Sequence, residues 1–227
     1  MESQQSHSKS LLFIVGGILL LVLLFFGLEK LASQDEDLRT VSMESNIQDE
    51  KFLGKTDAPV TLIEYSDFQC PACAAYEPLV RDLHKDFPDT LKIVYRYFPL
   101  ATIHKNAMIS AKAAQAALNQ GKFWEMHDML FDKQKDWEKV ENPQDIFIGY
   151  AEEIGLNKEQ FKQDIEKIET IDPIKRDEQL GKDINIHGTP SFFLNGKKIE
   201  NPQNYADFKK LVDDALATPS NPDSTKN

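Results

Sequence analysis

The chain has 227 residues, of which 37 are acidic and 26 are basic, so its formal net charge is −11. This balance argues against nucleic acid as a partner, because phosphate backbones are bound by clustered Lys and Arg side chains. The length suits one or two domains.

An apolar stretch near the start predicts a membrane anchor. Residues 11–28 form a run of eighteen residues without a charged side chain, which is about the shortest helix that crosses a bilayer. The apolar core of a cleaved signal is shorter, about 7–15 residues. We therefore expect one uncleaved transmembrane helix after a short tail of residues 1–10. A signal peptide cleaved near residues 31–33 and a buried helix of a soluble domain are the alternatives.

A polar linker separates this span from the folded part of the chain. Residues 29–50 carry seven acidic side chains against two basic ones, which is typical of a solvated spacer. Residues 60–65 (VTLIEY) are apolar and β-branched and predict a buried strand. Helical spacing of apolar residues over 72–87 and a second strand over 91–98 follow. Strand, helix and strand in this order indicate a βαβ unit with parallel pairing.

The second half changes from helices back to strands. Residues from about 100 to 186 are helical by their apolar spacing. Strands are expected at 191–194 and 197–199, on either side of Asn195-Gly196, which is a preferred two-residue hairpin turn. A last amphipathic helix precedes a frayed tail at 218–227. Residues 51–217 are thus expected to form one α/β domain with a helical insertion.

The chain has only two cysteines, Cys70 and Cys73, in the sequence Cys-Pro-Ala-Cys at the start of the first helix. A zinc site, two inert buried thiols and a structural disulfide are the alternatives to a reactive pair. One cysteine pair supplies too few ligands for structural zinc, and so short a closed loop stabilises a fold weakly. Free N–H groups and the dipole at a helix start favour a thiolate. We therefore expect Cys70 to be the exposed, acidic thiol and Cys73 the buried one.

Two motifs together resemble the DsbA family of thiol-disulfide oxidoreductases. They are Tyr-Ser-Asp-Phe-Gln-Cys-Pro-Ala-Cys at residues 65–73 and Gly-Thr-Pro-Ser-Phe-Phe-Leu-Asn-Gly at residues 188–196. The resemblance covers about residues 51–217 and is nearest to the membrane-anchored bacterial members. It implies a thioredoxin-like mixed sheet with an inserted helical domain. The dipeptide between the cysteines is Pro-Ala, whereas the best-known oxidases carry Pro-His, and this leaves the redox potential open.

The resemblance also implies which residues act. Cys70 and Cys73 are the redox pair, and Thr189 and Pro190 match a cis-proline loop that lies against them. Glu64 matches a buried acidic residue that exchanges a proton with Cys73. The alternatives are a trans proline that opens a strand and a solvated glutamate at the rim of the sheet.

The implied function is an extracytoplasmic oxidase that passes its disulfide to cysteine-containing unfolded or secreted proteins. No cofactor or metal beyond the cysteine pair is implied, and a DsbB-like membrane partner would reoxidise it. An oxidising catalyst belongs outside the cytoplasm. We therefore expect a single-pass protein of the cell membrane with its N-terminus in the cytoplasm. A reductase or isomerase of the same fold, and a peptide-holding chaperone without enzyme activity, are the alternatives.

Overall fold

The computed structural model describes residues 51–218. The predicted anchor at 11–28, the linker at 29–50 and nearly all of the C-terminal tail lie outside this range. No helix within residues 51–218 has the length and apolar composition needed to cross a bilayer.

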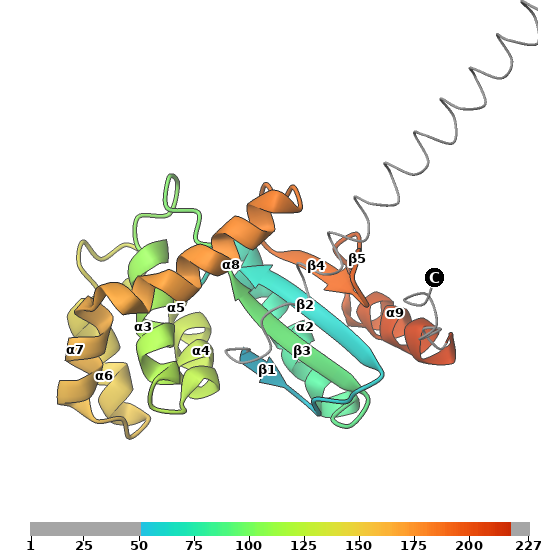
Figure 1. Cartoon of the computed structure of the whole chain (residues 1–227), viewed down its shortest axis with the longest axis horizontal. Helices are drawn as coiled ribbons and strands as arrows, with labels where there is room; N and C mark the ends of the chain where they lie inside the picture. The colour runs from blue at the N-terminus through green and yellow to red at the C-terminus, as the bar shows by residue number, and fades with distance from the viewer. Residues whose placement is uncertain (1–50, 219–227) are drawn as a thin grey trace, which may run out of the picture. The chain divides into compact units, whose positions relative to one another are not determined.

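A five-stranded mixed sheet forms the centre of the domain (Figure 1). Its strands lie in the order β1-β3-β2-β4-β5. The pairing of β2 and β3 is parallel, as the βαβ pattern predicts, and the other three pairings are antiparallel. The strands span Lys51–Leu53 (β1), Val60–Ser66 (β2), Leu91–Tyr97 (β3), Ser191–Leu194 (β4) and Lys197–Lys198 (β5).

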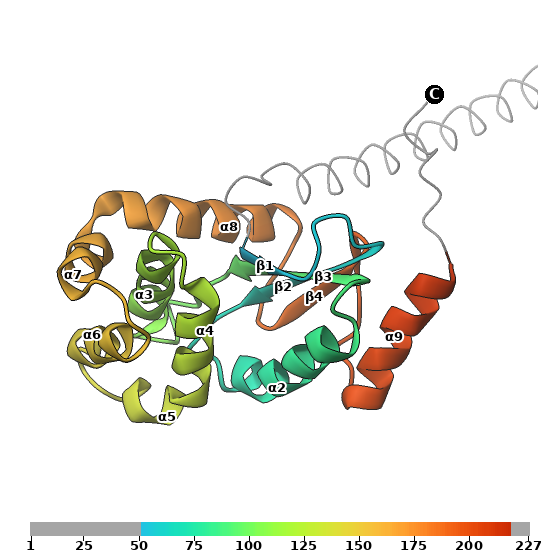
Figure 2. The same cartoon turned by 90° about the horizontal axis from the view of Figure 1, so that it is seen from below.

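Helices cover both faces of this sheet, as Figure 2 shows. Helices α2 (Pro71–Asp86) and α9 (Tyr205–Ala217) lie on one face, and α8 (Ile171–Asp183) crosses the other. Strands β2 and β3 are therefore buried along almost their whole length. Continuous apolar runs such as VTLI are typical of strands that are covered on both sides.

The other helices gather at one end of the sheet and form the insertion (Figure 1). Their shared core is built around large side chains that include the fully buried Trp137, Phe147 and Phe161. The helical block that was expected at about 100–186 is present, but its last helix, α8, packs across a face of the sheet. The remaining segments are α3 (Ala107–Leu118), α4 (Phe123–Asp132), α5 (Gln134–Trp137), α6 (Gln144–Glu153), α7 (Lys158–Glu166) and the 3₁₀ turn η2 (Ile168–Thr170).

Strand β1 is absent from the prediction made from the sequence. Its three residues pair antiparallel with β3, and Lys51 is buried at 3% exposure. The Lys51 Nζ lies 2.9 Å from Asp177 Oδ2 on α8, so β1 is fixed by an ion pair as well as by the sheet.

The predicted hairpin turn is confirmed. Asn195 and Gly196 have φ values of 47° and 79°, and two positive φ angles define the type I′ turn. The turn joins β4 to β5, so β5 forms one edge of the sheet.

Candidate active site

The cysteine pair lies where β2 ends and α2 begins. Cys70 is the N-cap residue of α2, with an extended backbone at φ −70° and ψ 121°, and Pro71 takes the first helical position. The Cys70 N–H donates to the carbonyl of Asp67 at 3.0 Å, which closes the turn after the strand. Both cysteines are free thiols. The fold therefore places both sulfurs at the start of a helix, just after a buried strand.

Cys70 is buried, so the prediction that it is the exposed thiol is wrong, whereas its pKa is lowered as predicted. Its residue exposure is 6%, because the turn and the neighbouring loops cover most of it. The pKa of Cys70 is lowered to about 5, chiefly by a hydrogen bond from the Cys73 thiol. Backbone N–H groups of Ala72 and Cys73 lower this pKa further, while burial opposes the shift. These are the donors that a helix start leaves free.

Cys73 lies one turn further into the helix, and its pKa is shifted in the opposite direction to that of Cys70. It is fully buried, and burial raises its pKa well above the ordinary value. The hydrogen bond that Cys73 donates to Cys70 raises this pKa further, and so do the negative charges of Cys70 and Glu64. At neutral pH the pair therefore holds one thiolate and one thiol.

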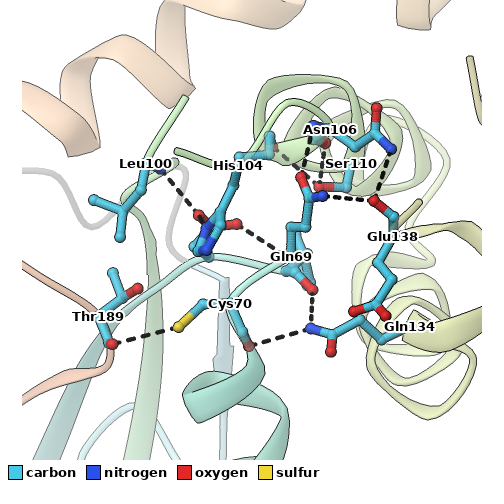
Figure 3. Close-up of polar contacts among 12 residues, drawn as sticks. Gln69, Cys70, Leu100, His104, Asn106, Ser110, Gln134, Glu138 and Thr189 are labelled. Atoms are coloured by element: carbon cyan, nitrogen blue, oxygen red, sulfur yellow. Dashed lines mark hydrogen bonds and ion pairs between the residues drawn. The ribbon is translucent and has the colours of Figure 1, made fainter. Parts of the chain in front are cut away.

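The Thr189–Pro190 loop lies against Cys70, as the resemblance implies. The Thr189–Pro190 peptide bond is cis. The Cys70 Sγ lies 3.5 Å from the Thr189 carbonyl oxygen (Figure 3). An open groove continues from this loop, lined in part by His187, Lys198 and Asn201.

Glu64 is buried and does not lie at a solvated rim. Its exposure is 4%, and burial raises its pKa from 4.5 to about 7. The negative charges of Glu77 and Cys70 also raise this pKa, whereas a hydrogen bond with Ser66 lowers it. A carboxyl group with a pKa near 7 can both take up and release a proton at neutral pH.

Polar side chains from the helical insertion hold the loop before Cys70, and no pattern in the sequence predicts these contacts. Gln134 Nε2 donates to the carbonyls of Phe68 and Cys70 at 2.7 and 3.1 Å. Gln69 Nε2 donates to the Glu138 carbonyl at 2.7 Å, and the Asn106 N–H donates to Gln69 Oε1 at 2.6 Å (Figure 3). These partners lie 37 to 69 positions apart along the chain, so no local motif signals them.

One other cluster has the residue types of a metal site. Potential ligand atoms of Glu77, His127 and Asp128 all lie within 4.8 Å of one another. However, Arg81 Nε donates to Glu77 Oε1 at 2.8 Å, and Arg81 Nη2 lies 3.9 Å from Asp128 Oδ1. The Arg81 guanidinium thus already pairs with both carboxylates, and we assign no ion to this cluster.

Several solved structures share this fold. BdbD from Bacillus subtilis, in its oxidised form, is 27% identical with a TM-score of 0.68, and the alignment covers 76% of this chain and 96% of BdbD. A thioredoxin-like oxidoreductase from Silicibacter pomeroyi is 25% identical with a TM-score of 0.64, covering 79% and 97% of the two chains. The alpha-DsbA1 protein of Wolbachia pipientis, at 18% identity and a TM-score of 0.69, covers 78% and 96% and shares the fold.

Curated relatives are much longer than the matched region. The Na⁺/H⁺ antiporter NhaA 3 of Salinispora tropica is 36% identical over 165 residues, which are 73% of this chain and 24% of the antiporter. The chain spans about a quarter of the length of the curated relatives that it matches.

A family model described as thioredoxin matches residues 46–214, nearly the whole domain described above. Enzymes of this type exchange electrons through a redox-active disulfide and use no external cofactor. With its cysteine pair, its cis-proline loop and its helical insertion, the chain belongs to the thioredoxin family and shares its fold with DsbA-type proteins.

Proposed function

We propose that this protein is an oxidase that transfers the Cys70–Cys73 disulfide to pairs of cysteines in unfolded or secreted proteins. The position of Cys70 at the N-cap of α2 carries this proposal. N–H groups and the Cys73 thiol surround the Cys70 sulfur and stabilise its thiolate. Stabilising the thiolate stabilises the reduced protein, and a stable reduced form makes the disulfide a stronger oxidant.

The exchange takes place in two steps. A substrate thiolate attacks Cys70 Sγ, which breaks the Cys70–Cys73 bond, forms a mixed disulfide and releases Cys73 as a thiolate. A second substrate thiolate then attacks the substrate sulfur of the mixed disulfide and releases the Cys70 thiolate. In total, two electrons pass from the substrate dithiol to the protein disulfide, and the substrate gains the S–S bond.

Glu64 would supply the proton that Cys73 takes up when it leaves. Cys73 is fully buried with a raised pKa, so its thiolate is unstable and must be protonated quickly. Glu64 is buried near it and has a pKa of about 7, so part of its population holds a proton at neutral pH. On the reverse path, Glu64 would accept the proton from Cys73.

The Thr189–Pro190 loop would bind the substrate chain during the exchange. Pro190 has no N–H, while the Thr189 backbone lies within 3.5 Å of the Cys70 sulfur. An extended substrate segment can pair with such a backbone edge. The groove beside the loop would then receive the residues that flank the substrate cysteine.

We place the catalytic domain outside the cytoplasm, held to the cell membrane by residues 11–28 with the N-terminus inside. Oxidases act in compartments where disulfides persist, and a membrane partner of the DsbB type would reoxidise the pair. We do not extend the antiporter activity named for the relatives to this protein, because the chain matches only about a quarter of their length.

The equilibrium constant of the reduced and oxidised protein with glutathione tests the direction of transfer. We expect a potential of about −200 mV or higher, compared with about −270 mV for thioredoxin. A value near that of thioredoxin, together with rapid reduction of insulin, would assign a reductase instead. Full complementation in cells by a protein with both cysteines changed to serine would assign a peptide-holding role.

The Cys73→Ser variant tests which cysteine forms the mixed disulfide. It has no internal disulfide to donate, but on the reverse path its Cys70 thiolate can still attack a disulfide of a substrate. Without the Cys73 thiol the resulting mixed disulfide cannot be resolved within the protein, so covalent adducts with substrates should accumulate. Cells that produce this variant should show adducts of high mass that disappear on reduction. The Cys70→Ser variant is the control and should show none. Adducts on Cys70→Ser and not on Cys73→Ser would reverse the assignment of the two cysteines.

A further inference from the structure

The side-chain amide of Gln134 donates to two backbone carbonyls in the turn that leads into α2. Its Nε2 donates to the Phe68 carbonyl at 2.7 Å and to the Cys70 carbonyl at 3.1 Å, as Figure 3 shows for Cys70. Because carbonyl oxygens only accept hydrogen bonds, the amide must present its NH₂ group here. Both hydrogens of one NH₂ group thus hold the turn that leads into α2.

The short helix that carries Gln134 is packed into the insertion. Gln134 is the first residue of α5 and is 6% exposed. In the same short helix, Trp137 is fully buried and its Nε1 donates to the Leu130 carbonyl at 3.0 Å. A side chain fixed on a packed element positions its partners more accurately than a mobile one does.

We propose that Gln134 is a positioning residue of the redox centre, supplied by the helical insertion. The Cys70 carbonyl accepts from Gln134 and also from the Ala74 N–H at 3.1 Å, which is the first backbone bond of α2. Fixing this carbonyl fixes the peptide planes that follow it. Those planes carry the N–H groups of Ala72 and Cys73 that point toward the Cys70 sulfur. This role rests on the proposed exchange at Cys70.

Loss of this contact should affect the reduced protein more than the oxidised one. In the reduced form the Cys70 thiolate depends on aligned N–H donors, because the interaction between a charge and a dipole changes with direction. In the oxidised form Cys70 is neutral and is held by its covalent bond to Cys73. A looser turn therefore raises the free energy of the thiolate and makes the disulfide a weaker oxidant.

The Gln134→Met variant tests this role, because Met has a similar length and no donor. The Gln115→Met variant is the matched control: Gln115 is also 6% exposed and also lies in the insertion, on α3, where its Nε2 contacts Asn119 at 3.5 Å. Thiolate absorbance against pH gives the Cys70 pKa, and equilibration with glutathione gives the redox equilibrium. We expect Gln134→Met to lower the acid dissociation constant of the Cys70 thiol by about three- to tenfold, which is the effect of about one net hydrogen bond. The equilibrium constant for oxidation of glutathione by the protein disulfide should fall by a similar factor.

The possible outcomes distinguish a positioning role of Gln134 from a general loss of folding stability and from a failure of the proposed function. If Gln134→Met and Gln115→Met have the same Cys70 pKa and the same glutathione equilibrium, the positioning role is wrong. If Gln134→Met does not fold, Gln134→Asn keeps the amide but is one methylene too short to reach both carbonyls. That variant should shift the pKa and the equilibrium in the same direction, and unchanged values would overturn the proposal. A wild-type protein that exchanges no disulfide with glutathione would instead contradict the proposed function.

Discussion

At the scale of single residues, the two cysteines differ in reactivity although both are buried. Cys70 has a pKa of about 5 and an exposure of 6%, whereas Cys73 is fully buried and its pKa is raised well above the ordinary value. The thiolate is the form that reacts with electrophiles. Charge therefore distinguishes the two sulfurs at least as strongly as access to solvent does.

Alkylation of the reduced protein at pH 6 should label Cys70 and leave Cys73 free. At this pH most of Cys70 is thiolate, because the pH lies above its pKa of about 5. Brief treatment with iodoacetamide followed by peptide mass spectrometry measures the ratio. In denaturant both cysteines should react alike, which serves as the control. Equal labelling in the folded protein, or faster labelling of Cys73, would contradict the assignment.

Glu64 should make the reduced protein lose stability as the pH rises. Its pKa is raised from 4.5 to about 7, so its contribution is fully present below pH 4.5 and is lost between pH 4.5 and 7. Ionising the buried carboxyl costs on the order of 3 kcal/mol over this window. The Glu64→Gln variant lacks that cost. Urea unfolding at pH 4.5 and pH 7 should therefore show the variant gaining stability over the wild type at the higher pH.

The control for this measurement is Glu169→Gln, at an exposed position of the insertion. A surface change of this kind should alter the free energy of unfolding by less than about 0.5 kcal/mol at either pH. If Glu64→Gln and Glu169→Gln behave alike at both pH values, the buried carboxyl does not ionise as described.

At the scale of elements, one buried carboxylate joins three parts of the fold. Asp177 on α8 lies 2.9 Å from Lys51 Nζ on β1 and 3.2 Å from Arg96 Nη1 on β3. It also accepts from the Tyr97 N–H at 3.1 Å. The side chain of Asp177 is 4% exposed, so these interactions are shielded from water. This carboxylate fixes both the short edge strand and the helix that covers the sheet.

The Asp177→Asn variant should lose about 3–5 kcal/mol of unfolding free energy, because two buried cations lose their shared negative partner. Denaturant unfolding measures the loss. Asp213→Asn is the control: its ion pair with Lys209 is 52% exposed on the Asp213 side, and such surface pairs are worth about 0–1 kcal/mol. A loss for Asp177→Asn no larger than that for Asp213→Asn would show that this junction contributes little.

Local sequence patterns identified the elements that have a clear period or a defined turn. Strands β2 and β3, helix α2 and the Asn195-Gly196 turn follow from such patterns. Strand β1 has three residues and no alternation, so only its pairing with β3 makes it a strand. Similarly, nothing in the sequence distinguishes Gln134 from any other polar residue of the helical block. Its contact with Cys70, 64 positions away, appears only once the insertion is folded onto the sheet.

At the scale of the whole molecule, the charge state of Cys70 is linked to the stability of the entire fold. In the unfolded chain a cysteine has a pKa of about 8.5, whereas in the folded reduced protein the pKa of Cys70 is about 5. A depressed pKa contributes stability that is present above the unfolded value and lost as the pH falls toward the folded value. At pH 8 this contribution reaches at most about 4 kcal/mol, and at pH 5 it is close to zero.

The relative melting temperatures of the reduced and oxidised proteins should therefore depend on pH. The oxidised form gains about 2 kcal/mol from closing a four-residue loop in the unfolded chain, and this gain does not depend on pH. At pH 5 the oxidised form should melt higher, whereas at pH 8 the reduced form should melt higher by several degrees. Paired melting curves with and without reductant across this range test the crossing, and a Cys70→Ser/Cys73→Ser protein should not respond to reductant. If the oxidised form melts higher at every pH, thiolate stabilisation is too weak to drive oxidation of substrates.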